Sequence, residues 1–367
     1  MNTLQRLYAE FGQSPWVDSI DRDLIESGAL ATMIGDGIRG LTSNPTIFAK
    51  AVAAGYYDEL IRSMHENGTD GQAIYEAIAV GDIRDAADLL RPVYDAADGA
   101  DGLASIEVEP SLSEDGDGTL RRARELWAAV DRPNIFVKIP ATGAGLPAIE
   151  SATAEGINVN ITLMFSVDVY QDVARAYIAG LRRLQAAGGD VSRIASVASF
   201  FVSRVDTKVD RLLDQAGTEA AARARGTAAV ANAQMAYQSF GEIFGGDEFA
   251  DLRAAGARVQ RCLWASTSTK DPSYPDVKYV EALIGPDTVN TMPRETIAAT
   301  LDHGRLARTL DHDFEAARAA LDAVESLGIS MRQVTDELIR EGVAAFATSF
   351  DELLATIEDK RRALATA

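Results

Sequence analysis

Eight short apolar segments recur along the chain of 367 residues, and they alternate with stretches of helical periodicity. Their β-branched and aromatic residues, bounded by proline, glycine or polar residues, are typical of buried strands. Strands that alternate with helices favour a parallel sheet, and eight such units can close into a (β/α)8, or TIM, barrel. We predict strands over Trp16–Ile20, Gly37–Thr42, Leu103–Glu109, Asn134–Thr142, Ile157–Phe165, Ile194–Val202, Arg258–Trp264 and Thr288–Pro293.

Extra helices are predicted at both ends of this barrel and after its sixth strand. Ser14-Pro15 is predicted as a break after the first helix. Because composition does not shift along the chain, residues 1–367 are predicted to form a single barrel domain with helical additions. The main helical tracts are predicted over Leu4–Glu10, Tyr56–Ala96, Thr119–Val130, Val167–Ala186 and Asp206–Phe244, and from Glu295 to the end.

The formal net charge of −20 argues against nucleic acid and anionic membranes as partners, since binding to either depends on lysine and arginine. One phosphate needs only one or two cations, so a small phosphorylated substrate is compatible with this charge. No apolar run approaches the ~18 residues of a membrane span, and the N-terminus lacks the features of a signal peptide. A cytoplasmic protein is therefore predicted, and the single cysteine, Cys262, fits a reducing compartment.

The histidines lie in polar, helical stretches without neighbouring residues that could complete a ligand set. They are His65, His303 and His312. The sequence therefore predicts neither a metal site nor a Ser-His-Asp relay.

The fourth strand carries one charge in its middle, Lys138. Alternation places Lys138 on the same face as Phe136, and if both faces of the strand are covered the ammonium group lies in a dry interior. Burial would lower the pKa of this amine, and a neutral amine can attack a carbonyl to form a Schiff base. The alternative is a lysine that reaches solvent at the strand end or pairs with a carboxylate.

Polar residues placed late on the other strands would meet Lys138 at the mouth of the barrel, where enzymes of this fold carry their chemistry. On the fifth strand Asn158, Asn160 and Thr162 alternate with apolar residues, which predicts a polar stripe toward the barrel interior. On the third strand Ser105, Glu107 and Glu109 are predicted to share one face. The residues collected in this way are Asp18, Asn44, Glu107, Lys138, Asn160, Thr162 and Ser199.

Two of these residues, Asp18 and Glu107, could serve as separate acid/base groups. Forming an imine requires loss of water, and breaking a carbon–carbon bond beside a hydroxyl requires removal of the hydroxyl proton. Either carboxylate taken alone is as readily explained as a structural ion-pair partner.

Five segments, in this order, resemble the signatures of the transaldolase family, and the resemblance extends from Trp16 to Pro293. The length of the chain and the stretch Trp264–Lys270 resemble the bacterial branch that includes actinobacterial enzymes. The segments are Gly40–Pro45, Glu107–Ser113, Val137–Thr142, Gly156–Leu163 and Ser199–Arg204.

This resemblance implies a cofactor-free (β/α)8 enzyme of the non-oxidative pentose phosphate pathway. Such an enzyme moves a dihydroxyacetone unit from sedoheptulose 7-phosphate to glyceraldehyde 3-phosphate, which gives erythrose 4-phosphate and fructose 6-phosphate. By resemblance Lys138 is the Schiff-base lysine and Asp18 the acid/base, while Glu107 and Thr162 hold the water that relays protons.

The same resemblance implies the residues that bind the substrate. Asn44 and Asn160 would bind hydroxyls of the dihydroxyacetone unit with help from Ser199, while Arg204 and Ser266 would bind phosphate.

One position departs from the family pattern. Better-known relatives carry a second phosphate arginine two residues after the serine, whereas this chain has Ser268 there, with Lys270 nearby as a substitute. The ammonium group of lysine contributes one compact charge, whereas the guanidinium group of arginine can donate two parallel hydrogen bonds to a phosphate. Without the resemblance, Arg204 would be interpreted as a surface ion pair with Asp206.

Three other functions compete with this interpretation. A fructose 6-phosphate aldolase shares the lysine, but resembles a shorter chain with glutamine in place of Glu107 and tyrosine in place of Phe201. A non-catalytic sugar-phosphate-binding barrel would be expected to lack Lys138 or Glu107, and a metal-dependent barrel enzyme would need a histidine and carboxylate cluster. The sequence leaves open whether the protein is a monomer or a homodimer.

Overall fold

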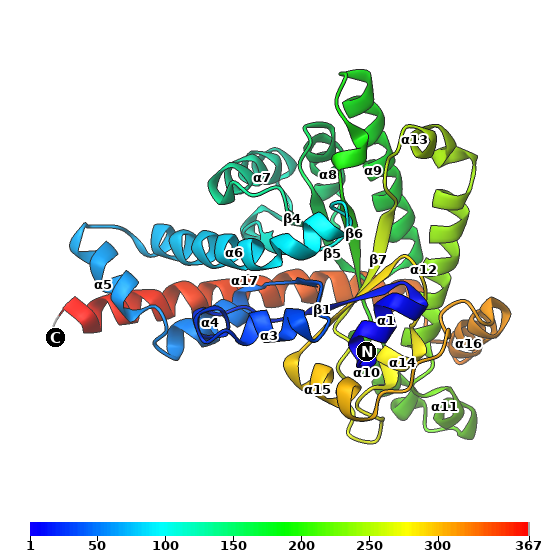
Figure 1. Ribbon diagram of the computed structural model, residues 1–367. Coiled ribbons are helices and arrows are strands. Elements are labelled where there is room, and N and C mark those ends of the chain that lie inside the picture. Colours follow the sequence, from blue (N-terminus) through cyan, green and yellow to red (C-terminus); the bar gives the residue numbers. More distant parts are fainter. Residues whose placement is uncertain (366–367) are drawn as a thin grey trace.

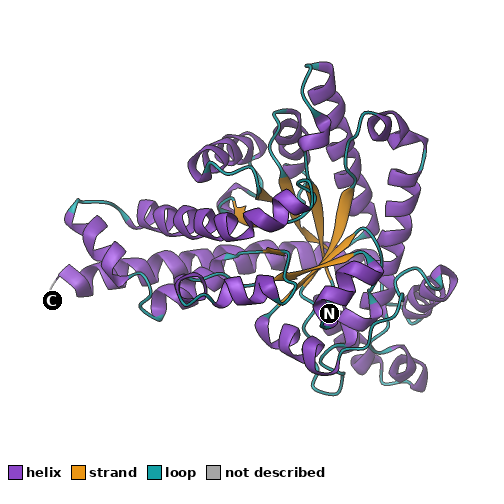
Figure 2. Ribbon diagram, viewed as in Figure 1, coloured by secondary structure: helices purple, strands orange, loops and turns teal. Residues whose placement is uncertain are grey.

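The computed structural model describes residues 1–365, so the last two residues of the predicted domain 1–367 lie outside it. Eight parallel strands form a closed barrel in sequence order, and β8 pairs with β1. The predicted (β/α)8 fold is confirmed, and helices surround the strands (Figures 1 and 2). The strands are β1 (Gln13–Val17), β2 (Gly40–Leu41), β3 (Leu103–Glu107), β4 (Ile135–Pro140), β5 (Val159–Met164), β6 (Ser196–Phe201), β7 (Gln260–Ala265) and β8 (Thr288–Met292).

The first strand differs from its prediction. It begins at Gln13 and contains Pro15, which was predicted as part of a break, and it ends at Val17 instead of Ile20. The Pro15 carbonyl accepts a hydrogen bond from the Arg39 N–H at 2.9 Å, on the side of β2. Because β2 is short and pairs with β1 at one register position, the missing N–H of proline removes little from the ladder.

Two further expectations about strand residues are wrong. β3 ends at Glu107, and Glu109, predicted to continue the polar face of that strand, instead accepts from Arg122 on α7 at 2.8 Å. On β5 the alternation breaks at Leu163, where the backbone has a φ of 60° and the register with β6 shifts. Both differences occur at strand ends, where the ladder no longer fixes the direction of side chains.

The helices confirm most of the predicted tracts. They are α1 (Thr3–Phe11), α2 (Arg22–Glu26), α3 (Ala29–Gly35), α4 (Pro45–Ala53), α5 (Asp58–Glu66), α6 (Gly71–Ala96), α7 (Gly116–Val130), α8 (Gly145–Ala154), α9 (Val167–Ala186), α10 (Ser203–Ala216), α11 (Glu219–Ala224), α12 (Ala228–Gly245), α13 (Ala250–Ala254), α14 (Lys278–Ala282), α15 (Arg294–His303), α16 (Phe314–Ser326) and α17 (Met331–Ala365). None of the helices in residues 1–365 combines the length and the apolar character needed to cross a membrane.

Three predicted tracts are interrupted. The tract Asp206–Phe244 is divided among α10, α11 and α12, at Gly217 with a φ of 63° and at Gly226 with a φ of 68°. The tract 56–96 is divided between α5 and α6 at Gly68, which has a φ of 77°, and Asp70 then caps α6 by accepting from the Ala73 N–H. The chain after Glu295 is not continuously helical, because α15 ends at His303, with Gly304 as its C-cap, and Asp313 caps the next helix. Glycine and aspartate are ordinary residues at such helix ends.

The long helix α17 crosses the barrel at the carboxyl ends of its strands. It packs against the end of β5 and against α10, and then runs beside α4, α5 and α6 away from the barrel (Figure 1). With 35 residues it extends for about 50 Å. The mouth of the barrel is therefore bordered by a helix that follows all eight strands in the sequence.

We expect Gly40→Ala to destabilise the protein by about 1–3 kcal/mol, because a Cβ at this position would lie 2.4 Å from the Trp16 ring and 2.8 Å from the Leu103 carbonyl oxygen. Gly241, inside α12, has no neighbouring atom within 4 Å of such a Cβ, so Gly241→Ala should stabilise the protein by about 0.5–1 kcal/mol. Denaturant unfolding of both variants measures the difference. A Gly40→Ala protein as stable as the wild type would contradict the packing described for β1 and β2.

Candidate active site

A cavity of about 660 Å³ opens at the carboxyl ends of the strands. Nine of the side chains predicted as site residues line it, and they come from β4, β5, β6, the first turn of α10 and the connections that follow β1, β2 and β7. These nine are Asp18, Asn44, Lys138, Thr162, Ser199, Phe201, Arg204, Ser266 and Lys270. The other two, Glu107 and Asn160, lie beneath this lining and contact it through hydrogen bonds. The eleven residues, which are widely separated in the sequence, are thus brought together.

Lys138 and Glu107 form the centre of the site. They occupy paired register positions on the neighbouring strands β4 and β3, so their side chains leave the barrel wall side by side. Lys138 is 5% exposed and Glu107 is 8% exposed. The Lys138 Nζ lies 3.2 Å from the Glu107 Oε2 and 3.1 Å from the Ser43 carbonyl oxygen. The lysine is therefore buried in the barrel and also paired with a carboxylate.

The two carboxyl groups of the site have shifted pKa values. Burial raises the pKa of Glu107, and the positive charge of Lys138 opposes this rise. Burial likewise raises the pKa of Asp18, against the opposing effects of Lys138 and of the Thr42 hydroxyl, which donates to Asp18 at 2.7 Å. Raised pKa values make both groups better proton donors near neutral pH than carboxyl groups in water.

A chain of amide and hydroxyl groups lies beside this pair. The Asn160 Nδ2 donates to the Ser105 Oγ at 3.0 Å, and the Ser199 Oγ donates to the Asn160 Oδ1 at 2.7 Å, which fixes the orientation of the amide. The Thr162 Oγ1 is buried and has no hydrogen-bond partner in residues 1–365. Buried hydroxyl groups are normally satisfied, so this one is suited to bind a water molecule or a substrate atom.

Asn44 has the extended backbone expected for a residue before proline, with a φ of −158°. Its Oδ1 accepts from the Ile47 N–H at 3.1 Å and so caps α4. The capping bond uses the oxygen of the amide and orients its Nδ2 group, which remains a donor beside the cavity. A structural role and a binding role are thus compatible in this residue.

Two further cations, Arg204 and Lys270, line the cavity. Arg204 stands over the Phe201 ring at 5.2 Å, and burial lowers its pKa from the ordinary value. Lys270 donates to the Ser268 Oγ at 2.7 Å, and the Ser266 and Ser203 hydroxyls are 2.9 Å apart. Within residues 1–365 no carboxylate forms an ion pair with Arg204 or Lys270. In a chain of net charge −20, two cations left facing a cavity favour an anionic ligand.

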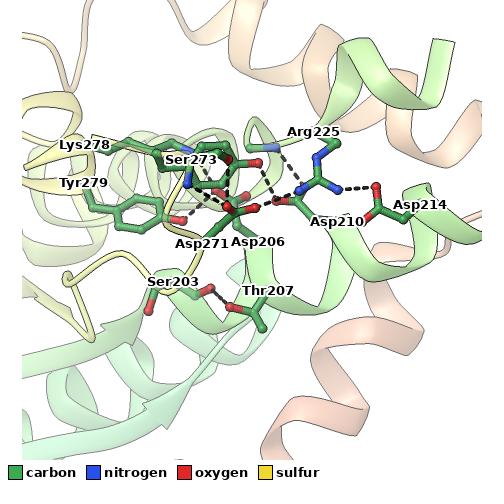
Figure 3. A network of polar contacts seen from close by, with 12 residues as sticks. Ser203, Asp206, Thr207, Asp210, Asp214, Arg225, Asp271, Ser273, Lys278 and Tyr279 are labelled. Atoms are coloured by element: carbon green, nitrogen blue, oxygen red, sulfur yellow. Dashed lines mark hydrogen bonds and ion pairs between the residues drawn. The ribbon is translucent and has the colours of Figure 1, made fainter. Parts of the chain in front are cut away.

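The ion pair between Arg204 and Asp206 that the sequence would otherwise suggest does not form. Asp206 is buried and instead accepts from the Lys278 Nζ and the Tyr279 hydroxyl, each at 2.9 Å (Figure 3). It also accepts from the Ala229 N–H at 2.7 Å. Its acceptor oxygens point away from the cavity, toward α12 and α14. This arrangement keeps Arg204 available for a ligand.

The segment 266–277, which carries Ser266 and Lys270, is held against α10 by the network in Figure 3. Asp210, one turn after Asp206, accepts from the Tyr274 hydroxyl at 2.6 Å, and Arg225 donates to Asp271 at 2.8 Å. Because Arg204 lies in the first turn of α10, the same helix positions both cations of the cavity.

Sequence reasoning missed several residues that line the cavity. Thr42, Thr291 and Ser268 belong to segments already predicted near the site, so their place on or just after strands could have indicated them. Lys50 on α4 and Phe346 on α17 could not have been found in this way, because nothing in a helical pattern shows which helix crosses the barrel mouth. Across residues 1–365 there is no cluster of histidine, cysteine or acidic side chains suited to hold a metal ion.

A model of the transaldolase/fructose-6-phosphate aldolase family matches residues 15–357. The chain belongs to this family. The family resemblance expected from the five sequence segments is therefore confirmed, and it agrees with the closed barrel and with a lysine at its mouth. The Schiff-base mechanism is general for this family.

Relatives from actinobacteria support transaldolase function. The chain is 51% identical to a transaldolase of Thermobifida fusca over 354 residues, which cover 96% of each chain. It is 51% identical to a transaldolase of Acidothermus cellulolyticus over 94% of each chain. It is 46% identical to a transaldolase of Mycolicibacterium smegmatis over 94% of this chain and 93% of the relative. The actinobacterial resemblance expected from the sequence is confirmed.

We expect Lys138→Ala to make stability strongly dependent on pH, because it leaves Glu107 buried without its partner. The folded variant would hold a proton on Glu107 that the unfolded chain loses above about pH 4.3, so its stability relative to the wild type should fall by about 3 kcal/mol between about pH 5 and pH 8. Thermal unfolding across this range measures the effect. The double variant Lys138→Ala/Glu107→Gln is the control and should lack this dependence; a single variant as independent of pH as the double would refute the buried pair.

Proposed function

We propose that the protein transfers a dihydroxyacetone unit from sedoheptulose 7-phosphate to glyceraldehyde 3-phosphate through a Schiff base on Lys138. The products are erythrose 4-phosphate and fructose 6-phosphate. The observation that carries this proposal is the buried contact between Lys138 and Glu107, 3.2 Å long, at a cavity that Arg204 and Lys270 also line. Sugar-phosphate substrates follow from the family.

Imine formation is the first step. The Lys138 ammonium gives one proton to Glu107, and the resulting amine adds to the substrate carbonyl carbon. The hydroxyl group of the carbinolamine then leaves as water after it accepts that proton from Glu107. The raised pKa of Glu107 supports this donor role. The unpartnered Thr162 hydroxyl, on the neighbouring strand β5, is suited to hold the departing water.

Cleavage and transfer use the second carboxyl group. Asp18 as the carboxylate removes the proton of the hydroxyl next to the bond that breaks, and the electron pair of that bond moves toward the iminium nitrogen to give an enamine. The aldehyde leaves, and the enamine carbon attacks the acceptor aldehyde. Asp18 then returns its proton to the new alkoxide, and water releases the product from Lys138.

Two groups of residues would share the binding of the substrate. Asn44, Asn160 and Ser199 would bind hydroxyl groups of the dihydroxyacetone unit, since their amides and hydroxyl lie beside Lys138. Arg204, Ser266 and Lys270 would bind phosphate. Arg204 can offer two parallel N–H donors, whereas Lys270 contributes a single charge.

A fructose 6-phosphate aldolase is the second candidate, because the family includes both activities. Glu107 and Phe201 favour transfer by resemblance, and the names of the relatives agree with this choice. The cytoplasmic location and the organisation of the chain as one domain stay predictions from the sequence.

Borohydride reduction in the presence of fructose 6-phosphate tests the proposed function directly. We expect a dihydroxyacetone-derived adduct on Lys138, located by peptide mass mapping, because borohydride converts the imine to a stable amine. Lys138→Ala should acquire no adduct and should lose transfer activity. An unmodified Lys138 in the wild type, or a Lys138→Ala protein with unchanged kcat, would reject the Schiff-base assignment.

We expect Lys270→Met to raise KM about tenfold for glyceraldehyde 3-phosphate, because one charged hydrogen bond to phosphate is lost. KM for glyceraldehyde, which has no phosphate, should change little. Steady-state kinetics with both acceptors measure the contrast. Lys50→Met, which removes another lysine of the cavity, is the matched control; equal effects of the two variants on KM would argue against a phosphate contact at Lys270.

A further inference from the structure

An aromatic ring covers the amine at the centre of the site. Phe346, on α17, lines the cavity, and its ring centre lies 5.5 Å from the Lys138 Nζ. No sequence motif indicated this residue. Because it comes from a helix that is not part of the strand and helix alternation of the barrel, its place over Lys138 depends on how α17 is held.

One anchor lies just before Phe346 in the sequence. Lys208 on α10, whose side chain is 6% exposed, forms ion pairs with Glu337 at 2.7 Å and with Glu341 at 2.5 Å. At Gly342 the helix lies so close to β5 that a Cβ would be 2.9 Å from the Leu163 Cδ2. Leu163, with its φ of 60°, thus packs against the covering helix at the mouth of the barrel.

A second anchor lies just after Phe346. The Phe350 ring meets Tyr75 of α6 edge to face at a centroid distance of 5.1 Å. The Thr46 hydroxyl of α4 donates to the Ser349 Oγ at 3.0 Å. With contacts on both sides, the backbone of α17 holds the Phe346 ring over the cavity.

A ring in this position acts on the intermediate more than on the free amine. The imine nitrogen carries a positive charge while it is protonated, as it must be for the carbon–carbon bond to break, and the face of an aromatic ring attracts a cation within about 6 Å. The ring is also an apolar cover that keeps water from the imine carbon. Both effects favour the covalent intermediate while the first aldehyde is exchanged for the second.

We propose that Phe346 is a specificity-determining residue that stabilises the Lys138 imine and shields it from water, so that transfer outcompetes release of dihydroxyacetone. This inference rests on the proposed function. Release requires the enamine carbon to accept a proton, water to add to the iminium carbon, and the C–N bond to break with its electrons returning to the Lys138 nitrogen. Phe346 acts against the addition of water.

The test compares two rates with fructose 6-phosphate as the donor: dihydroxyacetone release without an acceptor, and transfer to erythrose 4-phosphate. For Phe346→Leu, which keeps apolar bulk but removes the ring, we expect the ratio of release to transfer to rise about three- to tenfold. Phe346→Tyr keeps the ring and should leave the ratio near that of the wild type. Should Phe346→Leu fail to fold, Phe346→Met serves for the same comparison.

Phe249→Leu is the matched control, since it removes a buried ring that meets Phe244 edge to face at 5.1 Å, and Phe249 neither belongs to α17 nor lines the cavity. It should lower stability without changing the ratio. An unchanged ratio in folded Phe346→Leu, or an equal rise in Phe249→Leu, would overturn the inference. Borohydride trapping separates the two proposals: absence of a Lys138 adduct in the wild type rejects the proposed function, whereas a normal adduct with an unchanged ratio rejects the role of Phe346 alone.

Discussion

The burial of one amine against one carboxyl group is the constraint on which the site depends. Lys138 and Glu107 occupy paired positions on adjacent strands, and the closed ring of strands removes both from bulk water. A buried pair of this kind is commonly less stabilising than well-packed apolar side chains of the same volume. We therefore explain the presence of this pair by its proposed role in catalysis. The stability of the fold comes from the surrounding apolar core.

The positive side of the cavity depends on acidic residues that never face the substrate. Asp206 and Asp210 hold the segment 266–277 and the start of α12 to α10, and none of their acceptor bonds is made with Arg204. The acidic groups are thus bonded away from the cavity, while Arg204 and Lys270 remain free to attract anions. On a molecule of net charge −20, a local concentration of positive charge directs phosphorylated substrates to the mouth of the barrel.

Much of the fold and of the site was predictable, because local sequence patterns determine where the strands lie and which of their side chains point inward. Short runs of β-branched and aromatic residues identified all eight strands, and the period of two on the fifth strand indicated that Asn160 and Thr162 point inward. The patterns failed where long-range pairing decides the outcome. Pro15 was interpreted as a break because its tolerance in β1 depends on the shortness of β2, and Glu109 left the predicted strand because Arg122 lies within its reach. Phe346 was not predictable, since helical periodicity does not reveal which surface a helix crosses.

The order of elements along the chain separates closure of the barrel from completion of the cavity. β8, which closes the ring against β1, ends at Met292, whereas α17 begins only at Met331. A ribosome therefore delivers every strand before the covering helix emerges. The nascent protein can close its ring with the reactive amine still open to water, and it acquires its cover last.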